Sequence, residues 1–270
     1  MKVKNNELII LFNPKMQFKI IFQSEMEFST HKGIIKFPKL LKYGQIVTTN
    51  RDENFIILHA NLADKMLKVT RSTTIVYPKD WGMIVTELGI SSGKKIIEIG
   101  TGSGALTFTL ANIVGAKGKI DSIDISKEKQ DQGKNNFNLY SEFNNTTWHI
   151  IDLAKEKIKL SPADALFIDI PEPWTLLKEA RILLKDGHTV GLLCPTFEQV
   201  KETANALNEF GFTRIRCKEL IERTIYVRER STRPADIFKG HTAFYLFAEK
   251  IADKELKKMS KLKIRQIIER

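Results

Sequence analysis

Cysteine and long apolar runs are scarce in this chain of 270 residues. Its two cysteines, Cys194 and Cys217, are too few for a disulfide framework and do not have the spacing of a zinc site. The five histidines are scattered, so the sequence predicts no structural metal. No apolar run approaches the roughly 20 residues that a membrane-spanning helix needs, and no small-residue cleavage site follows the apolar patch Leu8–Phe12. We therefore predict a cytoplasmic protein without a membrane segment.

Acidic residues are also few relative to basic ones. The chain has 32 Asp and Glu against 43 Lys and Arg, which gives it a formal net charge of +11. Such an excess favours a polyanionic partner, with nucleic acid ahead of anionic lipid. Lysine-rich surfaces also occur in proteins of thermophiles without implying a partner, so charge alone leaves both interpretations open.

Residues 1–70 predict a small β-rich N-terminal domain. They contain short runs of strand-forming residues that glycine, proline and asparagine interrupt. The predicted strands are 8–12, 18–22, 33–37, 45–49 and 54–58. With eleven basic residues against six acidic ones, this domain is a candidate to hold nucleic acid, and a dimerisation or packing module is the alternative.

Residues 71–252 predict an α/β domain, and residues 253–270 a basic C-terminal helix. Apolar strands that alternate with helices indicate a mostly parallel sheet covered on both faces. The predicted strands are 95–99, 119–124, 147–151, 164–169, 188–194, 213–222 and 242–249, and the predicted helices are 81–88, 103–114, 126–139, 173–184 and 196–210. The last two strands are joined by a basic loop, and they predict an antiparallel edge.

The most prominent motif is a turn with three glycines, Gly100, Gly102 and Gly104, between a buried strand and a helix. Glycines let backbone approach a ligand closely, and the helix start adds free N–H groups. The turn fits the dinucleotide fingerprint if Ala105 is counted, and it also fits the Glu-x-Gly-x-Gly-x-Gly turn of S-adenosylmethionine-dependent methyltransferases. Glu98 favours the second, because a carboxylate attracts an ammonium and a sulfonium but gains nothing beside a diphosphate.

Three further carboxylates follow predicted strands. Asp124 ends the second strand, where an acid can accept both ribose hydroxyls, which either cofactor has. Asp152 ends the third, where contact with an adenine amine and a turn-capping role are equally consistent with the sequence. Asp169 follows a fully apolar strand and precedes the stiff loop Pro171–Trp174. Because ligands of such sheets bind at this rim, Asp169 is more consistent with a catalytic carboxylate than with a cap.

These motifs together make the chain similar to a known family. It resembles the tRNA (adenine-N1)-methyltransferases that modify position 58 of the T loop, of the archaeal and bacterial homotetrameric type, from about His31 to Glu249. The resemblance rests on the segments Tyr77–Asp80, Glu98–Thr107, Asp164–Trp174, Pro195-Thr196 with Gln199-Val200, and Arg233-Pro234 with Gly240–Thr242. The departures are Asp124 where the family mostly has Glu, Ile151 where Gly is usual, and Ala243 where Gly is common.

The resemblance implies a class I Rossmann-like fold and methyl transfer from S-adenosylmethionine to adenine N1 at position 58, and it leaves position 57 open. Asp169 would orient the adenine and stabilise its developing charge, and Tyr77 would contact the target base. Arg233 and His241 would contact RNA or pin the loop between the last strands, with Arg228, Arg230 and Lys239 gripping backbone. The implied cofactor-binding set is Val76, Glu98, Gly100, Thr101, Gly102, Ser103, Gly104, Asp124, Asp152 and Asp169.

Three other functions compete with this one. A nicotinamide dehydrogenase lacks a convincing catalytic His, Lys or Tyr-Lys pair. A methyltransferase acting on another RNA remains the alternative, as does a non-catalytic RNA-binding subunit, against which the intact glycine turn and Asp169 argue. The family further implies a homotetramer with tRNA as partner, and the sequence leaves a bridge between subunits through Cys194 or Cys217 open.

Overall fold

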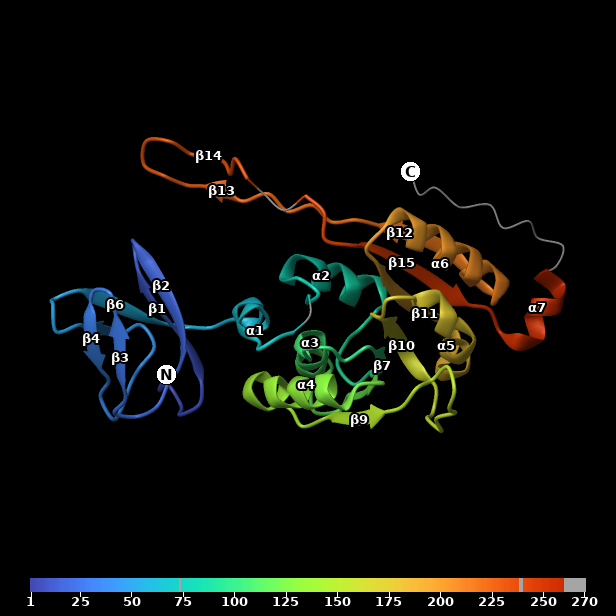
Figure 1. Cartoon of the computed structure of the whole chain (residues 1–270), viewed down its shortest axis with the longest axis horizontal. Helices are drawn as coiled ribbons and strands as arrows, with labels where there is room; N and C mark the ends of the chain where they lie inside the picture. Colours follow the sequence, from blue (N-terminus) through green and yellow to red (C-terminus); the bar gives the residue numbers. More distant parts are fainter. Residues whose placement is uncertain (73, 238–239, 260–270) are drawn as a thin grey trace.

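The computed structural model describes residues 1–72, 74–237 and 240–259. Figure 1 shows small N-terminal sheets, a larger α/β body, and a long two-stranded arm that projects from the body towards the end of the molecule holding the N-terminal sheets. Within the described ranges, no helix is long and apolar enough to cross a membrane.

The N-terminal strands form an antiparallel sheet of order β2-β1-β6-β5 and a separate hairpin, β3-β4. Leu11 of β1 faces Phe18 of β2 and Ile57 of β6, and it is buried with Phe22 and Phe55 in a small core. The strands are β1 (Leu8–Asn13), β2 (Met16–Ile21), β3 (Glu27–Thr30), β4 (Gly33–Lys36), β5 (Ile46–Thr48) and β6 (Asn54–His59). The predicted β-rich segment is confirmed, although the sequence analysis missed β3.

A short helix that the strand pattern did not predict follows these sheets. Helix α1 (Leu62–Lys68) begins at Asn61, whose side chain accepts from the backbone N–H of Asp64 while the Asp64 carboxylate accepts from the N–H of Asn61. This reciprocal capping box satisfies two backbone donors at the helix start. The domain limits at residues 70 and 252 stay a prediction.

The main sheet has the order β12-β15-β11-β10-β7-β8-β9. Its parallel strands are β7 (Lys95–Ile99), β8 (Lys119–Asp124), β9 (Thr146–Ile150), β10 (Ala163–Ile168) and β11 (Leu184–Cys194). Strand β15 (Phe244–Lys250) pairs antiparallel with β11 on one side and with β12 (Phe212–Lys218) on the other. The predicted, mostly parallel sheet with antiparallel pairing at one edge is confirmed, and the reversed strand is the second from that edge.

Helices cover both faces of this sheet, because successive apolar residues of a strand point to opposite faces and both must be buried. Ile96 of β7 belongs to a core with α1, α2 (Pro78–Glu87), α3 (Ala105–Val114) and the end of α4 (Lys127–Tyr140). Ile97 points to the opposite core, which is closed by α5 (Leu177–Leu183) and α6 (Phe197–Glu209).

Two helix starts differ from the prediction. Helix α2 begins at Pro78 rather than at Trp81, because a proline in the first turn loses no hydrogen bond that the helix would otherwise make. The helix predicted at 173–184 is instead a 3₁₀ turn, η1 (Pro173–Leu176), followed by α5, and β11 already starts at Leu184.

The segment between β12 and β15, which was predicted as a basic loop, forms the arm. Its strands are β13 (Ile225–Tyr226) and β14 (Arg233–Pro234), which pair antiparallel. After β15, helix α7 (Asp253–Met259) covers the first part of the predicted C-terminal helix. Lys239 and residues 260–270 lie outside the described part of the chain.

Candidate active site

The glycine turn lies between β7 and α3 and touches two neighbouring elements. Gly100 has φ +98°, and a Cβ built on it would lie 2.1 Å from the carbonyl oxygen of Asp169. Gly104, the N-cap of α3, has φ +73°, and its Cβ would lie 2.6 Å from the carbonyl oxygen of Gly133 in α4. Both positions therefore require glycine for backbone conformation and for space, and Gly102 between them also has a positive φ.

Glu98 lies beneath this turn and is buried. Its Oε2 accepts hydrogen bonds from the hydroxyls of Thr107 at 2.5 Å and Ser122 at 2.7 Å, and the Thr101 hydroxyl lies 2.7 Å from that of Ser122. Burial raises the pKa of Glu98 to about 8, a direction that nearby Asp169 and Asp124 reinforce and the two hydroxyls oppose. At neutral pH this carboxyl group therefore keeps its proton, and its direct contact with a ligand stays a prediction.

Asp124 joins the start of α4 to the glycine turn. Its Oδ1 accepts from the backbone N–H of Ser126 at 2.9 Å, and its Oδ2 accepts from that of Gly102 at 3.2 Å. The next residue, Ile125, is 71% exposed although it is a large apolar residue at the rim of the sheet. Ile125 is not among the predicted site residues, although its position points to it: it is an apolar residue directly after a strand-ending acid.

Asp152 lies in the turn after β9 and caps it. Its Oδ1 accepts from the backbone N–H of Ala154 at 3.1 Å, while its Oδ2 pairs with Lys155 at 2.9 Å. The hydrogen bond from Lys155 holds the pKa of Asp152 below its usual range. These contacts favour the capping alternative, and the adenine contact stays a prediction.

Asp169 begins the loop after β10, directly beside the glycine turn. Its backbone N–H donates to the carbonyl of Ile99 at 2.8 Å. Burial raises the pKa of Asp169 to about 6, which Lys129 of α4 opposes. Two residues further on, the carbonyl of Pro171 accepts a hydrogen bond from the side-chain amide of Gln199 at 2.9 Å. The structure thus brings Glu98, Asp124 and Asp169 together at the carboxyl ends of three parallel strands.

Tyr77 is the N-cap residue of α2, and Val76 before it is buried. The two residues after Pro78 fix this helix start in place. Lys79 donates to Asp80 at 2.6 Å, to the carbonyl of Leu220 at 2.6 Å and to the hydroxyl of Thr242 at 2.8 Å. The Thr242 hydroxyl donates in turn to Asp80 at 3.1 Å. The start of α2 is therefore tied to both ends of the arm segment, at Leu220 and Thr242, a long-range contact that no sequence motif indicates.

His241 and Arg233 both lie in the arm. The Nδ1 of His241 lies 2.7 Å from Glu219, and its Nε2 lies 2.9 Å from the carbonyl oxygen of Pro195. These contacts support the pinning role for His241, and the Glu219 carboxylate raises its pKa. Arg233 pairs with Asp236, and Figure 1 places its strand, β14, towards the far end of the arm, away from β10. An RNA contact of either residue stays a prediction.

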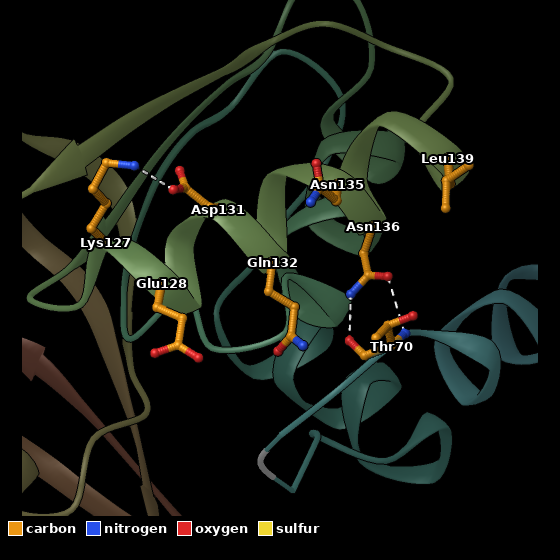
Figure 2. Close-up of a pocket in the computed structure, with 8 residues that line it drawn as sticks. All are labelled: Thr70, Lys127, Glu128, Asp131, Gln132, Asn135, Asn136 and Leu139. Carbon is orange, nitrogen blue, oxygen red and sulfur yellow. Dashed lines mark hydrogen bonds and ion pairs between the residues drawn. The ribbon is translucent and has the colours of Figure 1, made fainter.

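A groove of about 700 Å³ runs along α4 (Figure 2), outside the predicted site. Inside it, the side-chain amide of Asn136 donates to the carbonyls of Thr70 at 2.7 Å and Ser103 at 2.8 Å, and its oxygen accepts from the N–H of Thr70. The segment that leads to Tyr77 is thus fastened beside the glycine turn. The groove is lined by Thr70, Lys127, Glu128, Asp131, Gln132, Asn135, Asn136 and Leu139.

Comparison with known proteins identifies the family. The family model described as the tRNA methyltransferase complex GCD14 subunit matches residues 64–264, which is most of the chain. The chain belongs to the GCD14 family. This match includes the glycine turn, Asp124, Asp169 and the arm, and it leaves the N-terminal sheets outside.

Curated relatives of this GCD14-family chain come from archaea, bacteria and eukaryotes. The tRNA (adenine(57)-N(1)/adenine(58)-N(1))-methyltransferase TrmI of Methanocaldococcus jannaschii is 32% identical, over 82% of this chain and 87% of that protein. The tRNA (adenine(58)-N(1))-methyltransferase TrmI of Thermus thermophilus is 30% identical, over 87% and 94%. The catalytic subunit TRM61 of Candida albicans is 26% identical, over 86% and 72%.

Solved structures match the GCD14-family chain along nearly its whole length. A SAM-dependent O-methyltransferase from Thermotoga maritima has a TM-score of 0.86 at 30% identity, over 93% of this chain and 95% of that one. The tRNA (m1A58) methyltransferase TrmI from Aquifex aeolicus has a TM-score of 0.81 at 25% identity, over 93% and 100%. Because both cover more of the chain than the family model, the likeness extends into the N-terminal sheets.

Proposed function

We propose that this chain transfers a methyl group from S-adenosylmethionine to N1 of adenine 58 in the T loop of tRNA. The proposal rests on one observation: Asp169 lies directly against the glycine turn. The backbone carbonyl of Asp169 is so close to Gly100 that no other residue fits at that position. Membership of the GCD14 family and the activity printed for its TrmI relatives supply the substrate.

The residues around the turn fit this cofactor. Gly100, Gly102 and Gly104 have positive φ angles and no side chains, so a ligand meets backbone at these three positions. Asp124 at the end of β8 is the acid for the ribose hydroxyls, and exposed Ile125 beside it offers an apolar surface for the adenine ring. The proposed cofactor site also includes the buried Glu98, which would meet an ammonium and a sulfonium with opposite charge once ionised.

When bound, S-adenosylmethionine supplies an electrophilic methyl group. Adenine N1 is largely unprotonated at neutral pH and needs no strong base, so the task of the protein is to place it in line and to exclude water. Asp169 would accept a hydrogen bond from the exocyclic amine, which orients the ring and stabilises the positive charge that develops on it. Tyr77, at the start of α2, would contact the base that is drawn out of the tRNA fold.

Two finer points belong to the same proposal. A homotetramer is expected from the resemblance, and a cytoplasmic location from the sequence. The archaeal relative named for adenines 57 and 58 makes position 57 a second candidate. The Thermotoga structure is named as an O-methyltransferase, which makes a hydroxyl oxygen the competing acceptor. A hydroxyl must lose its proton on methylation, whereas adenine N1 carries none to lose.

The decisive experiment supplies the purified chain with radiolabelled S-adenosylmethionine and unmodified tRNA. We expect label in 1-methyladenosine after nuclease digestion, and none from a transcript in which adenines 57 and 58 are replaced by guanosine. A transcript with only position 57 replaced separates the two adenines. Label on a ribose hydroxyl, on another RNA base, or on no product would contradict the proposal.

A further inference from the structure

The rim beside the Asp169 loop carries a stack of aromatic rings outside the proposed site. The ring centroids of Phe197 and Phe244 lie 4.4 Å apart with an interplanar angle of 31°. The ring of His241 also contacts Phe244, with ring centroids 4.6 Å apart and an interplanar angle of 43°. Phe244 is nearly buried, whereas Phe197 is 71% exposed. The outermost ring is therefore supported on one side and open to solvent elsewhere.

Phe197 is not needed to start its helix. The Thr196 hydroxyl accepts from the backbone N–H of Gln199 at 3.3 Å, and the Gln199 side chain accepts from the N–H of Thr196 at 3.1 Å. This capping box satisfies two backbone donors at the start of α6, and the side chain of Phe197 takes no part in it. Neither capping nor core packing explains a large apolar ring at this position.

The stack is held firmly against the catalytic loop. Gln199, two residues after Phe197, donates to the carbonyl of Pro171 at 2.9 Å. His241 contacts the carbonyl of Pro195 at 2.9 Å, and Phe244, the buried ring, pairs with Cys194 at the carboxyl end of β11. Since β11 neighbours β10 in the sheet, the open ring lies one strand away from Asp169.

An unpaired nucleobase is the ligand that this stack suits. Bases drawn out of RNA structure bind on aromatic side chains, and every base has a face that can stack. We propose that Phe197, backed by Phe244 and His241, is a stacking platform for an unpaired base of the tRNA that lies beside the methylated adenine. This inference rests on the proposed function.

The test compares KM for unmodified tRNA, kcat and cofactor affinity among the wild-type chain, F197A and F197L. We expect KM to rise about tenfold in F197A, the size of one base–aromatic stacking interaction, with unchanged affinity for S-adenosylmethionine. F197L keeps the apolar bulk and loses the ring, so its KM should rise similarly. The matched control is I182A, which truncates a side chain that is 68% exposed in α5, next to the amino end of β11.

Each outcome bears on the proposal. A KM equal to that of the wild type in F197A or in F197L would overturn it. A smaller oligomer in F197A would also overturn it, because the Phe197 ring would then be covered by a second copy of the chain. Unchanged thermal unfolding and cofactor affinity confirm that the variants are folded. A wild-type chain that methylates no tRNA contradicts the proposed function itself, whereas an active wild type with an equally active F197A contradicts the platform alone.

Discussion

Asp169 is the residue whose protonation state matters most to the proposed reaction. It must be ionised to stabilise the positive charge that develops on adenine, yet burial raises its pKa to about 6. The carboxylate is therefore available at neutral pH and is lost as the pH falls through 6. A carboxyl group with a pKa of about 6 makes the rate of methyl transfer depend on pH in a range where most carboxyl groups stay ionised.

We expect kcat of the wild-type chain to be level above pH 7 and to fall about tenfold for each pH unit well below 6. D169N removes the ionising group, so its kcat should be about 100- to 1000-fold lower at pH 7.5 and independent of pH over that range. Single-turnover methyl transfer to tRNA measures both, and binding of S-adenosylmethionine shows whether the site stays intact. A D169N profile parallel to that of the wild type would remove Asp169 from the mechanism.

Glu98 gives a second prediction for a single residue, this time about stability. Its folded-state pKa is about 8 and its ordinary value is 4.5, so the folded state binds the proton more tightly. The stability that Glu98 contributes is fully present below pH 4.5 and is lost as the pH rises towards 8. E98Q mimics the protonated form. Between pH 4.5 and 8, the free energy of unfolding of the wild type should therefore decrease, relative to that of E98Q, by about 1.4 kcal/mol per pH unit. A constant difference in urea titrations would show that Glu98 is already ionised in the fold.

Among the elements, α2 depends most on contacts with distant parts of the chain. The ion pair of Lys79 and Asp80 is almost fully buried, with side chains 8% and 0% exposed. It bridges the helix start to Leu220 and Thr242, which lie more than 130 residues away in sequence. Removing one charge would leave the other buried without a counter-ion.

We expect D80N to lower the free energy of unfolding by about 3–5 kcal/mol, because the Lys79 ammonium loses its counter-ion in a buried site. The control is E27Q, which breaks the exposed pair with Lys36 and should cost less than about 1 kcal/mol. Urea unfolding at pH 7 measures both variants. Equal effects in the two would mean that the buried pair does not hold the start of α2.

The same elements show how far the sequence could predict the structure. Strands β7, β8 and β10 were predicted nearly to the residue, because each contains isoleucines or other large apolar residues and ends at or just before a glycine or an acid. The arm was not, since β13 and β14 have two residues each and no periodicity. The capping role of Asp152 depends on local geometry, and the contact of His241 with Pro195 joins residues 46 positions apart. Neither leaves a signal in the spacing of residue types.

At the scale of the whole molecule, positive charge is spread over separate parts of the chain. The N-terminal sheets carry many of the lysines, and the arm carries Arg228 and Arg230. Figure 1 shows the arm leaving the body at the carboxyl edge of the sheet, where its base contacts the start of α2. The arm and the N-terminal sheets point to the same end of the molecule, so a tRNA whose T loop reaches Asp169 would meet these basic residues at that end.

Salt dependence tests this distributed contact, because each phosphate that a cationic side chain neutralises releases counter-ions. We expect the logarithm of the tRNA association constant to fall linearly with the logarithm of salt concentration, with a slope steeper than about −3 for four or more phosphates. The double variant R228A/R230A should reduce the steepness by about 1.5, whereas K178A, an exposed lysine in α5, should leave it unchanged. Filter binding between 50 and 300 mM KCl measures the slopes. A flat response in the wild type would exclude phosphate contacts as the source of affinity, and equal slopes in the three proteins would confine those contacts to the rest of the chain.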